Sequence, residues 1–346
     1  MSRFLQLHLL TFFPPANLNR DDTGRPKTAV VGGTTRLRIS SQALKRAWRT
    51  SEVFTTALAG HMGQRTQRLG EVVLEHLLAG GMEQAKAQEV ARDIAGVFGK
   101  VKDARDPKPA RIEQLAFISP EERAAALALA DRALAGEQVE AKSAGLLRAA
   151  DTAADIALFG RMLAADPDYN REAAAQVAHA ITTHKVIVED DYYTAVDDLK
   201  TPAEDAGAGF LGEAAFGSGV FYLYLCVDKA LLLKNLGGDA ALAATALGAL
   251  AEAAATVAPR GKQNSFAAHG RAHYVLAERG DRQPRTLAGA FARPVSGEDL
   301  MAQSIEALER FRTELDAAYG AAADVTARME VGKSGSLRDI IAFCRG

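Results

Sequence analysis

The chain has 346 residues, 48% of them hydrophobic and 24% charged, with a formal net charge of −2. This composition is typical of a folded globular protein and excludes a disordered chain. The near-neutral charge argues against a generally basic nucleic-acid coat and leaves a local basic patch as the candidate contact with nucleic acid. The sequence has only two cysteines, Cys226 and Cys344, and shows no signal or transmembrane segment. We therefore expect a cytoplasmic protein with no membrane partner.

The N-terminal segment is predicted to be a strand. Residues 3–10, RFLQLHLL, place Leu5, Leu7 and Leu9 on one face, at the spacing of a β-strand. We expect Pro14 and Pro15 to end this strand, because prolines interrupt the hydrogen-bonding ladder. A polar loop follows and closes at Gly32 and Gly33.

A second strand is predicted over residues 35–40, TRLRIS. Arg36 and Arg38 alternate with apolar residues there, which predicts a strand with one cationic face. Ser40 or Ser41 is a suitable N-cap for the helix that follows, because a serine hydroxyl can accept a hydrogen bond from the first helical turn.

That helix is predicted to be amphipathic. Its apolar side carries Leu44 and Trp48 and is expected to face the core. The opposite side is an arc of about 100° that presents hydrogen-bond donors and holds Gln42, Lys45, Arg46 and Arg49.

Cations are concentrated in this N-terminal region. Eight lie between residues 20 and 49: Arg20, Arg25, Lys27, Arg36, Arg38, Lys45, Arg46 and Arg49. No carboxylate occurs between Asp22 and Glu52. Because loop, strand and helix all contribute, a surface that follows phosphates is favoured over an ordinary solvated charged face. The stretch lacks the phosphate-binding pattern GxxxxGK[ST], so a mononucleotide site is not supported.

The middle of the chain is predicted to be a helical insertion. Residues from about 60 to 150 are rich in Ala, Glu, Lys, Arg and Leu at helical spacing. Within this region Ser119, Pro120 and Glu122 form the pattern of a capping box with proline at the first helical position.

Strand character returns after the insertion. It covers residues 178–196, and residues 220–228, VFYLYLCVD, are apolar on both faces, which predicts a central strand. Later helices are predicted within residues 239–255 and 300–315. Strands at both ends with helices between them predict an α+β fold.

Carboxylates cluster at Glu189, Asp190 and Asp191, and again at Asp197 and Asp198. Such a group could hold Mg²⁺ for phosphoryl transfer. A solvated turn or an acidic surface facing a partner is favoured instead. The i,i+4 pair of histidines near residue 270 lacks the Glu of a zincin site, and no third ligand is evident. We therefore predict neither a metal nor a cofactor.

The stretch LNRDD…K…GGTTRLRISSQALKRAWR resembles the backbone subunit family of the type I-E CRISPR Cascade complex (CasC). The resemblance continues, in an order similar to that of the family, through DIALFGRM (155–162), AHAITTHKV (178–186), YYTAVDDL (192–199), GSGVFYLY (217–224), NLGG (235–238) and APRGKQNSF (258–266). The helical stretch from about 60 to 150 contributes little to it.

The resemblance implies an α+β fold shaped like a right hand. It has a modified RRM (ferredoxin-like) palm, a helical fingers insertion and an extended hairpin thumb. The implied parts are the first part of the palm (1–58), the fingers (59–178), a palm strand (179–190), the thumb (191–217) and the second part of the palm (218–346). The RNP aromatic motifs are absent, so ordinary RRM base stacking is not expected.

The resemblance also implies a function, which is not enzymatic. The chain would bind guide RNA (crRNA), polymerise head-to-tail with copies of itself into a helical filament, and present the bases for pairing with target DNA beside other Cascade subunits. By motif, Arg20, Lys27, Ser40, Gln42, Lys45 and Arg46 would line the RNA path, and helix geometry adds Arg49. Met162, with Arg161, would pack beside bases, and Tyr193 in the thumb would help to displace a base.

Two other interpretations remain open. One is a metal-dependent ribonuclease of a related CRISPR effector, with Asp21, Asp22 or Asp198 as candidate residues. The other is a structural oligomer without nucleic acid, whose basic helix face binds an acidic protein. Under the scaffold interpretation, the acidic thumb residues are hypothesised to contact the neighbouring subunit, and they are Asp190, Asp191, Asp197 and Asp198.

Overall fold

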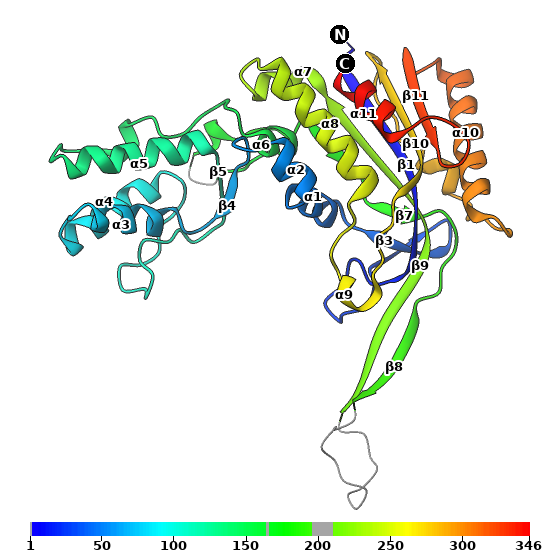
Figure 1. Ribbon diagram of the computed structural model, residues 1–346, viewed down its shortest axis with the longest axis horizontal. Coiled ribbons are helices and arrows are strands. Elements are labelled where there is room, and N and C mark those ends of the chain that lie inside the picture. The colour runs from blue at the N-terminus through cyan, green and yellow to red at the C-terminus, as the bar shows by residue number, and fades with distance from the viewer. Residues whose placement is uncertain (1, 164–165, 196–209) are drawn as a thin grey trace, which may run out of the picture.

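The computed structural model describes residues 2–163, 166–195 and 210–346. The described chain has three parts (Figure 1): a sheet covered by helices, a helical module to one side of it, and a long β-hairpin that projects away from it. The predicted α+β class is confirmed, and the three parts correspond to the expected palm, fingers and thumb.

The palm is built on an antiparallel sheet with the strand order β11-β10-β1-β9-β7-β3-β2, in which β6 and β8 also pair with β9. The strands are β1 (Phe4–Ala16), β2 (Thr28–Val31), β3 (Thr34–Ile39), β6 (Ala175–Val177), β7 (Ala180–Thr182), β8 (Glu189–Ala195), β9 (Phe210–Asp228), β10 (Ala272–Gly280) and β11 (Val325–Glu330). The predicted central strand lies in β9, which pairs with β1, β6, β7 and β8.

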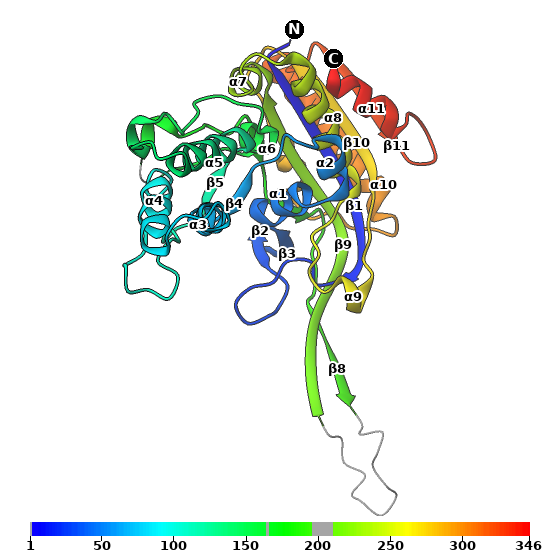
Figure 2. The ribbon, with the colours of Figure 1, turned by 60° about the vertical axis from the view of Figure 1, so that its left-hand side comes forward.

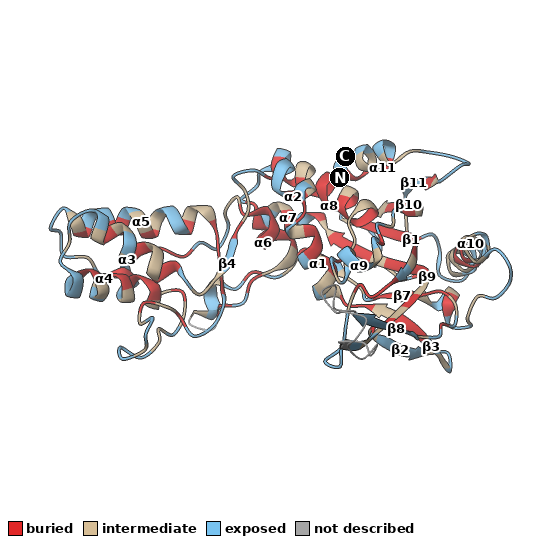
Figure 3. Cartoon of the chain, turned by 60° about the horizontal axis from the view of Figure 1, so that its bottom comes forward, coloured by how far each residue is buried: buried red, intermediate tan, exposed pale blue. Residues whose placement is uncertain are grey.

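Alternation along β1 divides the palm core between the two faces of the sheet. Leu9 pairs with Leu223 and belongs to the larger core, whereas the next residue, Leu10, belongs to a separate core on the other face. The larger core contains residues of α1 (Ser41–Arg49), α2 (Glu52–Ala57), α7 (Lys229–Asn235), α8 (Ala240–Thr256) and α11 (Leu337–Arg345). The other core lies beneath α10 (Leu300–Tyr319), as Figure 3 indicates by the buried residues of that helix.

The strand β1 does not end at its two prolines. It continues through Pro14 and Pro15 to Ala16, so the predicted end of the strand is wrong. The register with β9 shifts between Phe13 and Ala16. This irregularity accommodates two residues that have no N–H to donate to the ladder.

The fingers module has its own hydrophobic core. Its helices are α3 (Leu69–Ala79), α4 (Gln84–Gly96) and α5 (Pro120–Leu134), and it also contains a two-stranded sheet of β4 (Gln64–Thr66) and β5 (Ala116–Ile118). The predicted capping box of α5 is confirmed, since Ser119 and Glu122 each bond the other's backbone N–H.

The chain returns to the palm earlier than the predicted boundary at residue 178. The short helix α6 (Ala154–Phe159) packs Ala157 and Leu158 into the main core, and β6 pairs with β9. Residues 154–159 and 175–177 therefore belong to the palm and not to the predicted fingers range of 59–178.

The hairpin consists of β8 and the first third of β9, paired from Glu189 with Phe216 to Ala195 with Phe210. All seven residues of β8 are exposed, so the hairpin stands clear of the core (Figure 2). Among the described helices, none has the length and apolar character needed to cross a membrane.

Candidate nucleic-acid interface

The helix α1 presents donors on one side because its other side is buried. The Ser40 hydroxyl accepts from the Ala43 N–H at 3.3 Å and caps the helix, as predicted. Leu44, Ala47 and Trp48 are buried. The capping serine is itself only 6% exposed, so its role in the structure is to fix where α1 begins.

A groove of about 420 Å³ lies between α1 and the fingers module. Three segments line it: α1, the chain after α6, and the region of β4 and β5. The lining residues are Gln42, Lys45, Arg46, Arg49, Arg65, Gln114, Leu115, Phe117, Phe159, Gly160, Arg161 and Met162. Six of the ten predicted RNA-facing residues therefore meet in one hollow, although 120 residues separate Gln42 from Met162 in sequence.

The amine of Lys45 and the guanidinium of Arg46 supply cations at this groove. Arg46 is exposed, and Lys45 is half-buried with Nζ 5.7 Å from the centre of the Phe159 ring. Partial burial lowers the pKa of Lys45. A cation over a ring face keeps its attraction for an anion while it loses part of its hydration.

Arg49 is engaged within the chain. Its Nε lies 2.9 Å from Oδ2 of Asp155, and its guanidinium lies 4.5 Å from the Phe117 ring centre. Burial raises the pKa of Asp155, although hydrogen bonds from the Gly63 N–H and from Arg49 act to lower it. Arg49 thus lies in the wall of the groove with its charge balanced by a buried carboxylate, and it connects α1 to α6.

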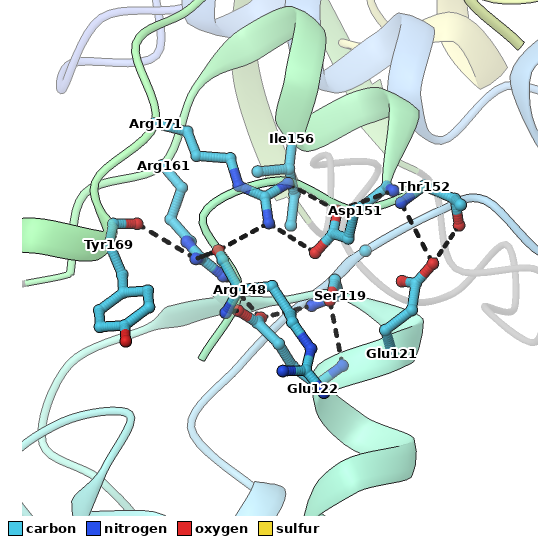
Figure 4. Close-up of polar contacts among 12 residues, drawn as sticks. Ser119, Glu121, Glu122, Arg148, Asp151, Thr152, Ile156, Arg161, Tyr169 and Arg171 are labelled. Carbon is cyan, nitrogen blue, oxygen red and sulfur yellow. Dashed lines mark hydrogen bonds and ion pairs between the residues drawn. The ribbon is translucent and has the colours of Figure 1, made fainter. Parts of the chain in front are cut away.

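The prediction that Arg161 faces a ligand is wrong for its side chain. The side chain has no exposed area, and Nη1 lies 2.6 Å from Oε2 of Glu122. The guanidinium also donates to the backbone carbonyls of Arg148 and Tyr169 (Figure 4). It donates to the Phe117 carbonyl as well. The reason is a carboxylate on α5 that the sequence pattern around residue 161 does not reveal.

Met162 has the opposite environment. Its side chain is 79% exposed at the edge of the groove, although the residues on both sides of it are buried. Leu115, 54% exposed, lines the same groove, and both residues also line a second hollow beside Phe98 and Lys100. Two exposed apolar side chains therefore form a ridge opposite the cations of α1.

The loop that carries Arg20 and Lys27 is tied to the start of α1. Arg20 forms a β-bridge with Pro26, and the Lys27 N–H donates to the Asn19 carbonyl at 2.8 Å. The Asn19 side chain in turn accepts from the Ser40 N–H at 2.8 Å. Arg20 is exposed and Lys27 half-buried, and Asn19 links the loop that carries them to Ser40 at the start of α1.

The predicted cationic face of β3 is only half correct. Arg36 is fully buried, where its guanidinium donates to Thr34 Oγ1 and to the carbonyls of Thr182 and Phe291. The segment that contains Phe291 covers this face of the strand. Arg38 is half-buried, and its Nη1 lies 2.9 Å from Nδ1 of His179.

The hairpin holds the remaining predicted residue. Tyr193 lies on β8, opposite Gly212, and its side chain is 45% exposed. Of the acidic thumb residues, Asp190 pairs with Arg25 of the same chain at 2.7 Å and Asp191 is exposed. Asp197 and Asp198 lie outside the described residues.

The residues proposed for metal-dependent chemistry do not form a cluster where the structure describes them. The Asp21 carboxylate accepts from the Thr23 hydroxyl, the Thr23 N–H and the Arg25 N–H. The Thr23 hydroxyl makes the largest contribution to the lowered pKa of Asp21. Over residues 2–163, 166–195 and 210–346, no group of three or more His, Cys, Asp and Glu side chains could hold a metal ion. Asp22 is exposed, and Asp198 lies outside these ranges.

Sequence reasoning missed the part of the groove that comes from the fingers. Arg65, Gln114 and Leu115 lie on or beside β4 and β5, two strands of three residues each. Such short strands carry no useful periodicity. Leu115 directly precedes the apolar strand β5, so its sequence context gives no sign that its side chain is exposed.

Residues 5–339 match the model of a family described as CT1975-like protein (Cas_CT1975). The chain belongs to this family. No curated protein sequence matches it significantly.

Two solved structures are similar to this CT1975-like chain over nearly its whole length. A chain in a structure titled "CRISPR RNA-guided surveillance complex, pre-nicking" is 28% identical, with a TM-score of 0.85 over 99% of this chain and 100% of that chain. A chain in a "CRISPR RNA-guided surveillance complex" is 26% identical, with a TM-score of 0.62 over 96% of this chain and 91% of that chain. The likeness therefore includes the palm, the fingers and the hairpin, and it supports a CRISPR-associated family.

Proposed function

We propose that the chain is a crRNA-binding backbone subunit of a type I-E CRISPR Cascade complex. The observation that carries the proposal is the groove in which Gln42, Lys45 and Arg46 of α1 face the apolar side chain of Met162. The family and the likeness to chains of RNA-guided surveillance complexes support a partner that is guide RNA.

The groove suits a ligand that is recognised without regard to its sequence. Cations and amide donors bind phosphate oxygens, which are the same in every spacer. Apolar side chains such as Met162 and Leu115 pack against base faces and leave the pairing edges free for target DNA. No reaction is required for this role, so the proposed function is not enzymatic.

The proposed assembly is head-to-tail. Contacts between two different surfaces of the same chain generate an open helical filament, which can cover a linear RNA beside other Cascade subunits. The exposed hairpin with Tyr193 is proposed to reach the neighbouring copy and its RNA, where an aromatic side chain can displace a base.

The test is RNA binding by the purified full chain at several salt concentrations, with and without EDTA. We expect binding to survive EDTA and the logarithm of affinity to fall with the logarithm of salt concentration, with a slope of roughly −0.7 per phosphate neutralised. Arg20→Glu with Lys45→Glu should abolish RNA co-purification. The control is Arg310→Glu with Lys333→Glu, which changes the net charge equally at two exposed positions away from the groove.

Retention of RNA by the first double variant would overturn the assignment of the path. Mg²⁺-dependent cleavage that is lost on Asp→Ala substitution at Asp21, Asp22 or Asp198 would favour the ribonuclease interpretation. Absence of any RNA affinity in the unsubstituted chain would favour the protein-binding oligomer.

A further inference from the structure

The fingers and the palm have separate hydrophobic cores, and a buried polar cluster lies where the chain passes between them. This cluster, the junction cluster, consists of Glu122, Asp151, Arg161 and Arg171. Leu147 belongs to the fingers core and Ala154 to the palm core, so Asp151 lies at the crossing.

Both ion pairs of the junction cluster are almost completely withdrawn from water. The side chains of Arg161 and Glu122 have no exposed area, and those of Arg171 and Asp151 are 1% and 2% exposed. Arg171 binds both carboxylate oxygens of Asp151 at 2.6 Å. Burial would raise the pKa of Asp151, but the hydrogen bonds and charge of Arg171 keep that pKa below its usual value.

The two pairs share one backbone carbonyl. The Arg148 oxygen accepts from Nη2 of Arg161 at 3.1 Å and from Nη2 of Arg171 at 2.9 Å (Figure 4). The Arg148 N–H donates to Glu122 at 2.9 Å. Arg161 and Arg171 also exchange both backbone hydrogen bonds. Charge-assisted, bidentate bonds fix orientation as well as distance, so the cluster fixes the helix α5 relative to the segment after α6.

That segment carries Met162. The two flanking side chains point inward, Arg161 into the junction cluster and Leu163 into the fingers core. The Leu163 N–H is held by Asn170 Oδ1 at 2.6 Å. Because side chains alternate along extended backbone, Met162 must point outward, into the groove.

We propose that Arg161 and Arg171, with their carboxylate partners, are positioning residues of the groove. They hold Met162 and the fingers at a set distance from α1 before RNA arrives, so that binding does not have to order this part of the site. The inference rests on the proposed function, because it assigns a role in RNA binding to side chains that do not touch RNA.

The experiment compares guide-RNA affinity and its salt dependence in four chains: unsubstituted, Glu122→Gln with Arg161→Gln, Met162→Ala, and the triple variant. The paired Gln variant keeps the length of the Glu122 side chain, shortens that of Arg161 and removes both charges together. The control is Arg132→Gln with Glu137→Gln, which removes an exposed ion pair from the same helical module.

We expect the paired Gln variant to lose affinity by about tenfold, which is the loss expected when one methionine side chain no longer packs against the RNA. The salt slope should not change. Met162→Ala should then cost little more in the triple variant, since the two changes remove the same interaction. A slope that becomes shallower by roughly 0.7 would make Arg161 a phosphate contact and would overturn the inference. Additive losses, or an affinity equal to that of the control, would also overturn it.

Circular dichroism and thermal unfolding show whether the paired Gln variant folds. If it does not, Arg171→Lys provides the same comparison, because lysine keeps the charge and loses the bidentate geometry. Failure of the proposed function is distinct from failure of the inference: in the former case the unsubstituted chain binds no guide RNA, and in the latter it binds and the variants bind equally well.

Discussion

Arg49 of α1 is bonded to Asp155 of α6, with 2.9 Å between Nε and Oδ2. The same carboxylate accepts the Gly63 N–H at 2.8 Å, at the point where the chain enters the fingers. One buried carboxylate therefore connects the helix that presents the cations with both the palm and the start of the fingers. The arrangement separates the cations of α1 into those that can bind a ligand and one that is structural.

We predict that Arg49→Ala mainly lowers the stability of the fold. Its effect on the salt dependence of RNA binding should be small. The substitution leaves the fully buried Asp155 without its cation, which should lower the free energy of unfolding by about 1–3 kcal/mol. Urea unfolding measures this loss. Arg46→Ala, at an exposed position of the same helix, is the control and should leave the free energy of unfolding within about 0.5 kcal/mol. Equal effects of the two substitutions would contradict the structural role of Arg49.

Leu115→Ala should reduce guide-RNA affinity and leave the salt slope unchanged. The side chain is 54% exposed on the ridge with Met162, so it can pack against a base without contacting a phosphate. A several-fold loss is expected, because truncation removes only part of one apolar contact. The measurement is fluorescence anisotropy with labelled RNA, and Val331→Ala, another exposed apolar position, is the control. If the two variants bind equally well, the ridge has no role.

Stability should fall as the solution becomes acidic because of His8 and Glu278. His8 is completely buried, with Nε2 3.3 Å from Glu278 Oε2, and burial lowers the pKa of His8 more than Glu278 raises it. Burial opposes ionisation of Glu278, but His8 and Arg285 lower its pKa to about 2. For both groups the folded pKa is the lower one, so the unfolded chain takes up protons first as the pH falls.

His8 should lower the stability as the pH falls below its ordinary pKa of 6.5. Glu278 should lower it between its ordinary pKa of 4.5 and its folded pKa of about 2. Unfolding free energies from pH 7 to pH 3 test this order. His8→Gln should flatten the upper part of the profile, whereas His269→Gln, at an exposed position, should not. A profile that His8→Gln leaves unchanged would exclude His8 as the source.

In the hairpin, we predict that substitutions at the adjacent residues Asp190 and Asp191 affect different properties. Asp190 already pairs with Arg25 of its own chain, and both side chains are about half exposed, so loss of this pair costs little stability. Asp191→Lys should impair assembly of several copies on one RNA if the acidic hairpin face meets the neighbouring subunit. Sedimentation of the RNA complexes gives the number of copies bound. Normal assembly by both Asp191→Lys and Asp190→Lys would remove these residues from the interface.

Local sequence signals predicted the palm well where the structure is itself local. The serine cap, the buried Leu44 and Trp48, and the donor side of α1 all follow from helical periodicity over nine residues. The capping box of α5 in the fingers and the apolar central strand of the palm also follow from short stretches of sequence.

At the candidate site, the errors concern side chains whose partners are distant in sequence. Arg49 is paired with a carboxylate 106 positions away, and Arg161 with one 39 positions away. Arg36 is covered by a carbonyl 255 positions away. An arginine on a predicted polar face has the same local pattern whether its partner is a phosphate or a buried carboxylate, so only the fold distinguishes the two cases.

The strand β9 belongs to two parts of the molecule at once. Its 19 residues run from the projecting hairpin to the centre of the palm sheet, a span of about 60 Å for an extended chain. Gly217 and Gly219 lie midway, where Leu37 and His184 occupy the space that a side chain would need. With no loop between the two parts, a load applied to the hairpin passes along a continuous backbone into the most heavily paired strand. A force on the hairpin is therefore transmitted directly to the palm core.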